Sequence, residues 1–182
     1  MEYRKTIQLW DGRPCVIRNG TEKDGSAVYE NFNLTHGQTD FLLSYPEENS
    51  MDPEQEARFL QAKTKSENEI ELIAEIEGRV VGTAGVEAVG TKEKVRRRAE
   101  FGISVDQRYW GLGVGRALME ACIQCAKKAG YAQLELNAVS DNERALALYR
   151  TAGFVEYGRN PRGFYSRLTD WQELVLMRLE LD

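Results

Sequence analysis

The sequence has little cysteine and little histidine, with three cysteines and one histidine among 182 residues. Cys15, Cys122 and Cys125 cannot build a disulfide framework. The Cys122-x-x-Cys125 spacing would suit a redox or metal role, but both cysteines share the apolar face of a predicted helix. No second cysteine pair and no nearby histidine would complete a metal site. We therefore favour core packing for both, expect no metal, and take a reducing cytoplasm as the default location.

Long apolar runs and an excess of positive charge are also missing. No stretch approaches the roughly 20 residues that a membrane span requires, and Met1–Lys5 leads into no apolar secretion segment. The net charge of −5 disfavours a nucleic-acid partner. The basic cluster at Lys92–Arg98 fits a solvated turn better than an edge that attracts a phosphate-bearing ligand. We expect neither a membrane nor a nucleic-acid partner.

No internal repeat or low-complexity segment is present, and hydrophobic residues make up 42% of the chain, enough for a core. The length fits a single domain over residues 1–182, with an extra N-terminal strand within residues 1–14. Hydrophobic periodicity predicts strands at 5–10, 15–18, 71–76, 80–86, 99–105, 134–138, 154–157 and 174–181.

Helices are predicted from Thr21 or Asp24 through Phe32, from Asp52 to about Thr64, over 114–129, and from a Ser140–Glu143 capping box to Arg150. Hairpins therefore mix with strand–helix–strand crossovers, which predicts an α/β fold: a mixed sheet with helices on its faces. The turn-rich segment 35–50 contains Phe41, Leu42, Leu43 and Tyr45, so we expect it to cover a cleft.

Three glycines alternate at the start of the longest predicted helix, in Trp110-Gly111-Leu112-Gly113-Val114-Gly115. Glycine is a poor helix former. The first turn of a helix leaves backbone N–H groups unpaired, and with the aligned peptide dipoles they attract an anion. Glycine permits positive φ angles and lets a phosphate approach the backbone. The glycines therefore favour a phosphate or pyrophosphate cradle over a turn needed only for tight packing.

Two familiar phosphate-binding loops do not match. A Walker A loop would continue with Lys-Ser/Thr, but Arg116-Ala117 follows Gly115. A dinucleotide fold wants G-x-G-x-x-G after the first strand of a parallel sheet, and here the glycines follow a hairpin past the middle of the chain. The spacing and position of the glycines therefore disfavour a nicotinamide cofactor as the ligand.

The run 110–115 resembles a signature of the GNAT superfamily of N-acetyltransferases, Arg/Gln-x-x-Gly-x-Gly/Ala, which binds the pyrophosphate of acetyl-coenzyme A. It matches at the glycines and departs at the first position, where Trp110 stands in place of Arg or Gln. Residues 142–154 resemble the second family segment, N-x-x-A…L-Y-x-x-x-G-F. The resemblance is sharp from Glu71 to Tyr157 and only topological before Glu71.

The resemblance implies a mixed, mostly antiparallel sheet that splays open at two parallel strands, here Glu100–Val105 and Gln133–Ala138, flanked by about four helices. It implies acetyl-CoA as cosubstrate, bound in that cleft, with Asn142 bonding the coenzyme arm unless it is an ordinary helix-start residue. Many relatives are dimers, so a homodimer is also expected. The remaining coenzyme contacts are backbone at Ile103, Ser104 and Val105 for the pantetheine arm, and Trp110, Gly111, Leu112, Gly113, Val114, Gly115 and Arg116 for the phosphate cradle.

The same resemblance places Tyr149 as the general acid that protonates the departing thiolate; the alternative is a tyrosine that only fills the core. Glu100 is the candidate general base for the amine; the alternative is a surface or salt-bridged glutamate beside Arg96–Arg98. Weaker candidates for a proton or substrate contact are Glu75, Glu87 and His36.

The resemblance implies an N-acetyltransferase (an acyltransferase) that moves an acetyl group from acetyl-CoA to a primary amine of a small molecule, by direct attack in a ternary complex. A protein N-terminal or lysine acetyltransferase is one alternative, and a non-catalytic acyl-CoA-binding sensor is another. A purely structural interaction domain fits the two linked segments poorly. The acceptor depends on the first half of the chain and on the predicted loop 160–165, which the sequence does not interpret.

Overall fold

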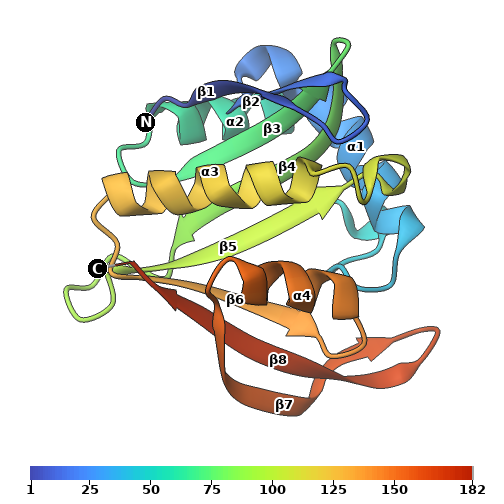
Figure 1. The fold of residues 1–182 in the computed structure, drawn as a ribbon, viewed down its shortest axis with the longest axis vertical. Helices are drawn as coiled ribbons and strands as arrows, with labels where there is room; N and C mark the ends of the chain where they lie inside the picture. Colours follow the sequence, from blue (N-terminus) through green and yellow to red (C-terminus); the bar gives the residue numbers. More distant parts are fainter. Residues whose placement is uncertain (182) are drawn as a thin grey trace.

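The computed structural model describes residues 1–181, and its centre is one eight-stranded sheet in the order β1-β2-β3-β4-β5-β6-β8-β7 (Figure 1). All neighbouring strands are antiparallel except β5 and β6. The strands are β1 Arg4–Gln8, β2 Pro14–Asn19, β3 Ile70–Ile76, β4 Arg79–Ala88, β5 Arg98–Val105, β6 Gln133–Val139, β7 Val155–Ser166 and β8 Asp170–Glu180.

Helices cover both faces of the sheet. In Figure 1, α3 and α4 lie in front of the sheet, and α1 and α2 lie behind it, packed against each other. Among the described residues, no helix is both long enough and apolar enough to cross a membrane. The α-helices are α1 Gly25–Gln38, α2 Pro53–Lys65, α3 Val114–Lys128 and α4 Glu143–Thr151, and the 3-10 turns are η1 Glu22–Asp24, η2 Pro46–Glu48 and η3 Gln107–Tyr109.

Helix α3 packs on the sheet through an apolar face that recurs every three or four residues. Val114, Leu118, Ala121, Cys122 and Cys125 on that face are all buried. Both helix cysteines are therefore core residues, as the packing interpretation predicts. Burial raises the pKa of the Cys125 thiol to about 11, so this thiol stays protonated at neutral pH.

The parallel pair β5–β6 is short, and this shapes the molecule. The two strands are in register only at Arg98–Gln133, Ala99–Leu134 and Glu100–Glu135, and then they part. On its other side β5 stays paired with β4 up to Val105, and β6 stays paired with β8 up to Val139. Beyond Glu100, each strand therefore turns an unpaired backbone edge toward a gap inside the sheet. The predicted fold, a mostly antiparallel sheet splayed at one parallel pair, is confirmed.

Two local predictions are wrong. The Ser140–Glu143 capping box does not form, because the side chain of Asn142 caps α4 by accepting the Ala145 N–H at 3.3 Å. Residues 160–165 are not a loop: they belong to β7, where the register shifts between Asn160 and Phe164. Pro161 and Gly163 signalled a break in the strand, and the irregular register accommodates them within it.

Candidate active site

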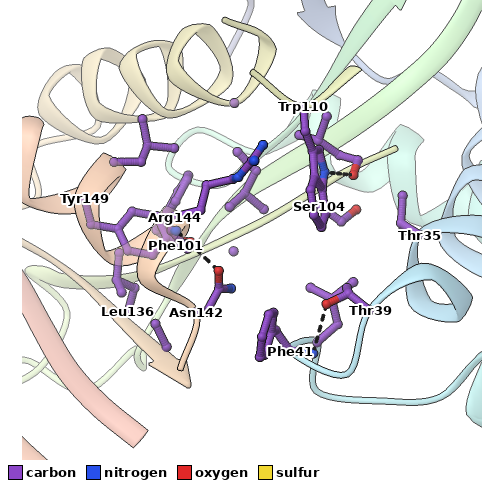
Figure 2. A pocket seen from close by; sticks show the side chains of 18 of the residues that line it. Thr35, Thr39, Phe41, Phe101, Ser104, Trp110, Leu136, Asn142, Arg144 and Tyr149 are labelled. Atoms are coloured by element: carbon purple, nitrogen blue, oxygen red, sulfur yellow. Dashed lines mark hydrogen bonds between the residues drawn. The ribbon is translucent and has the colours of Figure 1, made fainter. Parts of the chain in front are cut away.

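A cavity of about 650 Å³ opens where β5 and β6 part. Its walls come from both strands, from the glycine loop before α3, from the start of α4, and from residues 39–43 after α1. The volume lies within the range of small-molecule and cofactor sites. Figure 2 shows Tyr149, Phe101 and Leu136 on one side of this cavity and Thr35 and Thr39 on the other.

The three glycines of the loop are required for different reasons. Gly111 and Gly113 have φ angles of 77° and 99°, which a residue with a side chain adopts only under strain. Gly113 is the N-cap of α3 and offers no side-chain cap, so the first amides of the helix keep their hydrogen atoms free for a ligand. Gly115 is already helical. A Cβ there would lie in ordinary contact with Leu148, at 3.5 Å, on the cavity wall.

Trp110 links the loop to the strand before it. Its indole N–H donates to the Val105 carbonyl at 2.7 Å, so the ring is fixed across the end of β5. The Arg144 guanidinium reaches from α4 over this ring, 5.2 Å from its centroid (Figure 2). None of the ion pairs in the described part of the chain involves Arg144. Trp110 therefore holds an uncommitted cation at the glycine end of the cavity, where the family signature places Arg or Gln.

Trp10 belongs to the same end, although it lies about 100 residues earlier in the chain. Its backbone N–H donates to the Leu112 carbonyl at 3.2 Å, and its ring lies 3.6 Å from where a Cβ on Gly113 would be. The side chain is 72% exposed and lines the cavity. Sequence reasoning missed it, because nothing in the first hairpin signals a contact with the glycine loop.

Tyr149 lies on α4 deep in the cavity wall. Its ring meets Phe101 edge to face, with centroids 6.2 Å apart, and lies 6.0 Å from Phe154. Burial raises the pKa of the phenol to about 12, so it stays protonated through neutral and mildly alkaline pH. Tyr149 both packs in an aromatic cluster and lines the cavity. Its position is therefore compatible with both predictions, a tyrosine that fills the core and a general acid.

Two carboxylates face the cavity from the last paired positions of β5 and β6. Glu100 is exposed, and its side chain is in none of the ion pairs among the described residues. Glu135, its partner in register, is buried and bonded by the Arg98 guanidinium, one N–H donating at 2.7 Å. Arg98 pairs with Glu135, so the salt-bridged form of the alternative for Glu100 is not seen, whereas its exposure agrees with a surface glutamate. Sequence reasoning missed Glu135, because alternation alone placed it on an undistinguished polar face.

The weaker carboxylate and histidine candidates lie elsewhere. Glu75 pairs with Arg18 and Glu87 with Lys63, and neither lines the cavity. His36 stacks on Phe32 with ring centroids 3.6 Å apart, and burial lowers its pKa. His36 is also absent from the cavity wall. Of the four carboxylates and the histidine considered, only Glu100 and Glu135 reach the cavity.

The end opposite the glycine loop is bordered by the segment between α1 and α2. Phe41, Leu42 and Leu43 line the cavity, in agreement with the expectation that this segment covers a cleft. The tip of the β7–β8 hairpin holds the segment in place: Ser166 hydrogen-bonds to Asp40, and the Arg167 backbone N–H donates to the Tyr45 hydroxyl at 2.8 Å. These contacts join residues more than 120 positions apart.

The structure brings most of the predicted site residues together at this cavity. Leu112 and Val114 are not among the lining residues: the Leu112 carbonyl accepts from Trp10, and the Val114 side chain is buried in the core, although its amide belongs to the uncapped first turn of α3. In the described part of the chain, no three His, Cys, Asp or Glu side chains gather where they could hold a metal. The predicted residues that line the cavity are Glu100, Ile103, Ser104, Val105, Trp110, Gly111, Gly113, Gly115, Arg116, Asn142 and Tyr149.

Comparison with known proteins agrees with this arrangement. Residues 35–154 match the model of the acetyltransferase (GNAT) family. A solved structure, the acetyltransferase of GNAT family from Streptococcus pneumoniae, is 28% identical and superposes with a TM-score of 0.87 over 92% of this chain and 99% of that one.

Two curated relatives from Escherichia coli (strain K12) differ in the acceptor that they are named for. The [ribosomal protein bS18]-alanine N-acetyltransferase is 36% identical over 44% of this chain and 54% of its own length. The L-amino acid N-acyltransferase MnaT is 25% identical over 91% of this chain and 94% of its own length. The matched part spans about half of the length, or less, of several curated relatives.

Proposed function

This chain belongs to the acetyltransferase (GNAT) family, and on that premise we propose that it transfers an acetyl group from acetyl-CoA to a primary amine of a small molecule. Residues 1–182 act as one domain in this proposal, and both substrates are bound together when the amine attacks. The observation that carries it is the gap between β5 and β6, which opens directly beside the uncapped start of α3.

The donor end uses backbone more than side chains. The free amides at Gly113–Arg116 and the positive end of the α3 dipole receive the diphosphate, and Arg144 adds a cation from the opposite wall. The pantetheine arm runs along the open edge of β5 at Ile103–Val105, and its amides bond to strand backbone as an added strand would. The thioester then lies near Tyr149.

The chemistry needs three proton or charge steps. A free alkylamine has a pKa of about 10, so Glu100 accepts a proton from the ammonium, directly or through water. The neutral nitrogen attacks the thioester carbonyl, and backbone N–H groups on the open edge of β5 stabilise the oxyanion. The nitrogen of the tetrahedral intermediate loses its second proton to water, the C–S bond breaks, and Tyr149 donates its proton to the thiolate, while Glu100 returns its proton to solvent. The phenol then recovers a proton from solvent.

A protein N-terminus is the second candidate acceptor, supported by the similarity to the ribosomal-protein alanine N-acetyltransferase. The β7–β8 hairpin and the segment after α1 border the cavity entrance on the side where a peptide would enter. A homodimer and a cytoplasmic location stay predictions; light scattering on the purified protein tests the first.

An amine panel tests the proposed function. Purified protein is mixed with acetyl-CoA and small amines, polyamines, lysine peptides and N-terminal peptides, and free thiol is followed over time. We expect thiol release with a small amine and N-acetylated product by mass spectrometry. Release only with peptides would favour the second candidate, and acetyl-CoA binding without release for any amine would favour a sensor.

A further inference from the structure

We infer that the acceptor is an amine with an apolar, preferably aromatic, body and without a carboxylate group; this inference rests on the proposed function and names its substrate class. It is drawn from the end of the cavity opposite the glycine loop. Its wall there comes from the segment after α1 and from β7, two parts of the chain that the β7–β8 hairpin tip holds together.

The wall at that end is apolar and partly open. Phe41, Leu42, Leu43, Tyr157 and Phe164 all line the cavity. Leu43 is 84% exposed and Tyr157 is 48% exposed. An aromatic ring in the cavity would cover part of this surface, and each Å² of apolar area removed from water stabilises the complex by about 25 cal/mol. The wall therefore selects an acceptor with an apolar body.

The charges in the cavity are separated by sign. Among residues 1–181, the charged side chains that line it are Arg116, Arg144, Glu100 and Glu135. Both arginines stand at the starts of α3 and α4, beside the glycine loop. Both glutamates stand at the last paired positions of β5 and β6, and Glu135 already forms an ion pair with Arg98. The single uncompensated charge on the strand side is thus the Glu100 carboxylate, which attracts an ammonium group.

A carboxylate on the acceptor would have no cation to meet. No lysine or arginine of the described chain lines the apolar wall itself. Outside the cavity, Arg167 pairs with Glu47, Arg162 lies over the Trp171 ring, and Arg178 lies over the Tyr157 ring. The carboxylate of an α-amino acid, two bonds from its nitrogen, would be forced toward Glu100. Like charges and an unpaired buried anion both oppose binding. The acceptor should therefore differ from that of a free amino acid acetyltransferase.

Calorimetry with three matched ligands tests this inference apart from turnover. Protein saturated with CoA, which carries no acetyl group to transfer, is titrated at pH 6.5 with phenethylamine, L-phenylalaninamide and L-phenylalanine. Most of each amino group is protonated there, since an α-amino group has a pKa of about 7.7 or above. We expect phenethylamine and the amide to bind at least about tenfold more tightly than phenylalanine, a difference of about 1.4 kcal/mol in binding free energy.

The outcomes separate the inference from the proposed function. Phenylalanine binding as tightly as phenethylamine, or no binding by any of the three, overturns the inference whatever the enzyme turns over. An amide that binds as weakly as phenylalanine also overturns it, because bulk rather than charge would then exclude the acid. Tight amine binding without thiol release in the panel assay leaves the inference standing and defeats the proposed function.

Two leucine variants test the apolar wall. Leu43→Ala removes a cavity-lining side chain, whereas Leu168→Ala removes a leucine of similar exposure, 78%, in the β7–β8 turn, which is not among the residues that line the cavity. We expect Leu43→Ala to weaken phenethylamine binding about threefold to tenfold, and Leu168→Ala to leave it unchanged, with CoA binding the same in both. Equal effects of the two variants would contradict the assignment of this wall.

Discussion

The two ends of the cavity are built in different ways. The glycine end is made from consecutive residues at the start of α3, and its functional groups are backbone amides fixed by Gly111 and Gly113. The opposite end, where we propose that the acceptor binds and which we call the acceptor end, is made from segments more than 120 residues apart, held together by side-chain contacts such as Ser166 with Asp40. A local backbone site tolerates changes in neighbouring side chains. A site assembled from distant side chains changes with each of them, which suits a family that keeps one donor and varies the acceptor.

The largest expected effect is at Tyr149, between the two ends. Tyr149→Phe keeps the ring in its aromatic cluster and removes the proton donor, so we expect kcat to fall by about 100-fold or more. The Kd for CoA, measured by calorimetry, should change less than twofold.

The pH profile of the wild type sharpens the same point. The pKa of Tyr149, raised to about 12 by burial, means that the acid is still protonated at pH 10. kcat should therefore rise with pH as the amine loses its proton, and it should show no decrease at any pH up to 10. A Tyr149→Phe variant that retains wild-type kcat would remove the tyrosine from the mechanism.

A smaller effect is expected from a substitution at Gly115, which should make the protein more stable but weaken its binding of CoA. Gly115→Ala places a methyl group on the cavity wall 3.5 Å from Leu148 without strain, so the free energy of unfolding should rise by up to about 1 kcal/mol. The same methyl group should weaken CoA binding about tenfold, because it keeps the diphosphate from the amides.

Gly113→Ala is the matched comparison. Its φ of 99° should make this variant less stable by about 1–2 kcal/mol. Thermal unfolding measures the stability of the two variants, and calorimetry measures their affinity for CoA. If Gly115→Ala bound CoA as well as the wild type does, the glycine would serve packing only, and the diphosphate would lie elsewhere.

A more modest effect is expected from the cation at the glycine end. Arg144→Ala removes the guanidinium above Trp110 and should raise the KM for acetyl-CoA about fivefold, consistent with one exposed charge-assisted contact to phosphate. Arg150→Ala, on the exposed last turn of the same helix, is the control and should leave it unchanged. The KM for the amine should be the same in both variants. Equal KM values for acetyl-CoA in the two variants would remove Arg144 from the donor site.

The smallest effect is expected at the acceptor end. Tyr45→Phe removes the hydroxyl that accepts the Arg167 N–H at 2.8 Å but keeps the ring under the guanidinium. Loosening of the segment that carries Phe41 should raise the KM for the amine about twofold to threefold, the scale of one exposed hydrogen bond. Tyr165→Phe, an exposed hairpin tyrosine outside the cavity wall, is the control. A change in the KM for acetyl-CoA instead would show that the two ends are coupled.

The sequence predicts the glycine end well because its information is local. Glycines before an amphipathic helix, and a second segment 142–154, specify a strand–loop–helix unit whose backbone amides we propose as the binding groups. Trp110 is the exception there. Its role depends on Arg144 from another helix and on the Val105 carbonyl, and neither contact follows from spacing.

The acceptor end could be predicted only as an unusually apolar loop. Phe41, Leu42 and Leu43 indicate that something is covered, but the contacts of Asp40 and Tyr45 with the hairpin tip depend on the tertiary fold. Residues 160–165 were misjudged for a related reason: Pro161 and Gly163 favour a turn locally, and pairing with β8 overrides that preference. The pairing of Arg98 with Glu135 rather than Glu100 likewise depends on the register of β5 with β6.

The central claim is that free amides at the start of α3 and the open edge of β5 together hold an acyl-CoA. A crystal structure of the CoA complex tests it most directly. The account predicts the diphosphate within hydrogen-bond distance of the amides at Gly113–Arg116, and the pantetheine arm between β5 and β6 beyond Glu100. Density for the diphosphate anywhere else, such as beside the basic turn at Lys92–Arg97, with the gap between the strands left empty, would contradict it.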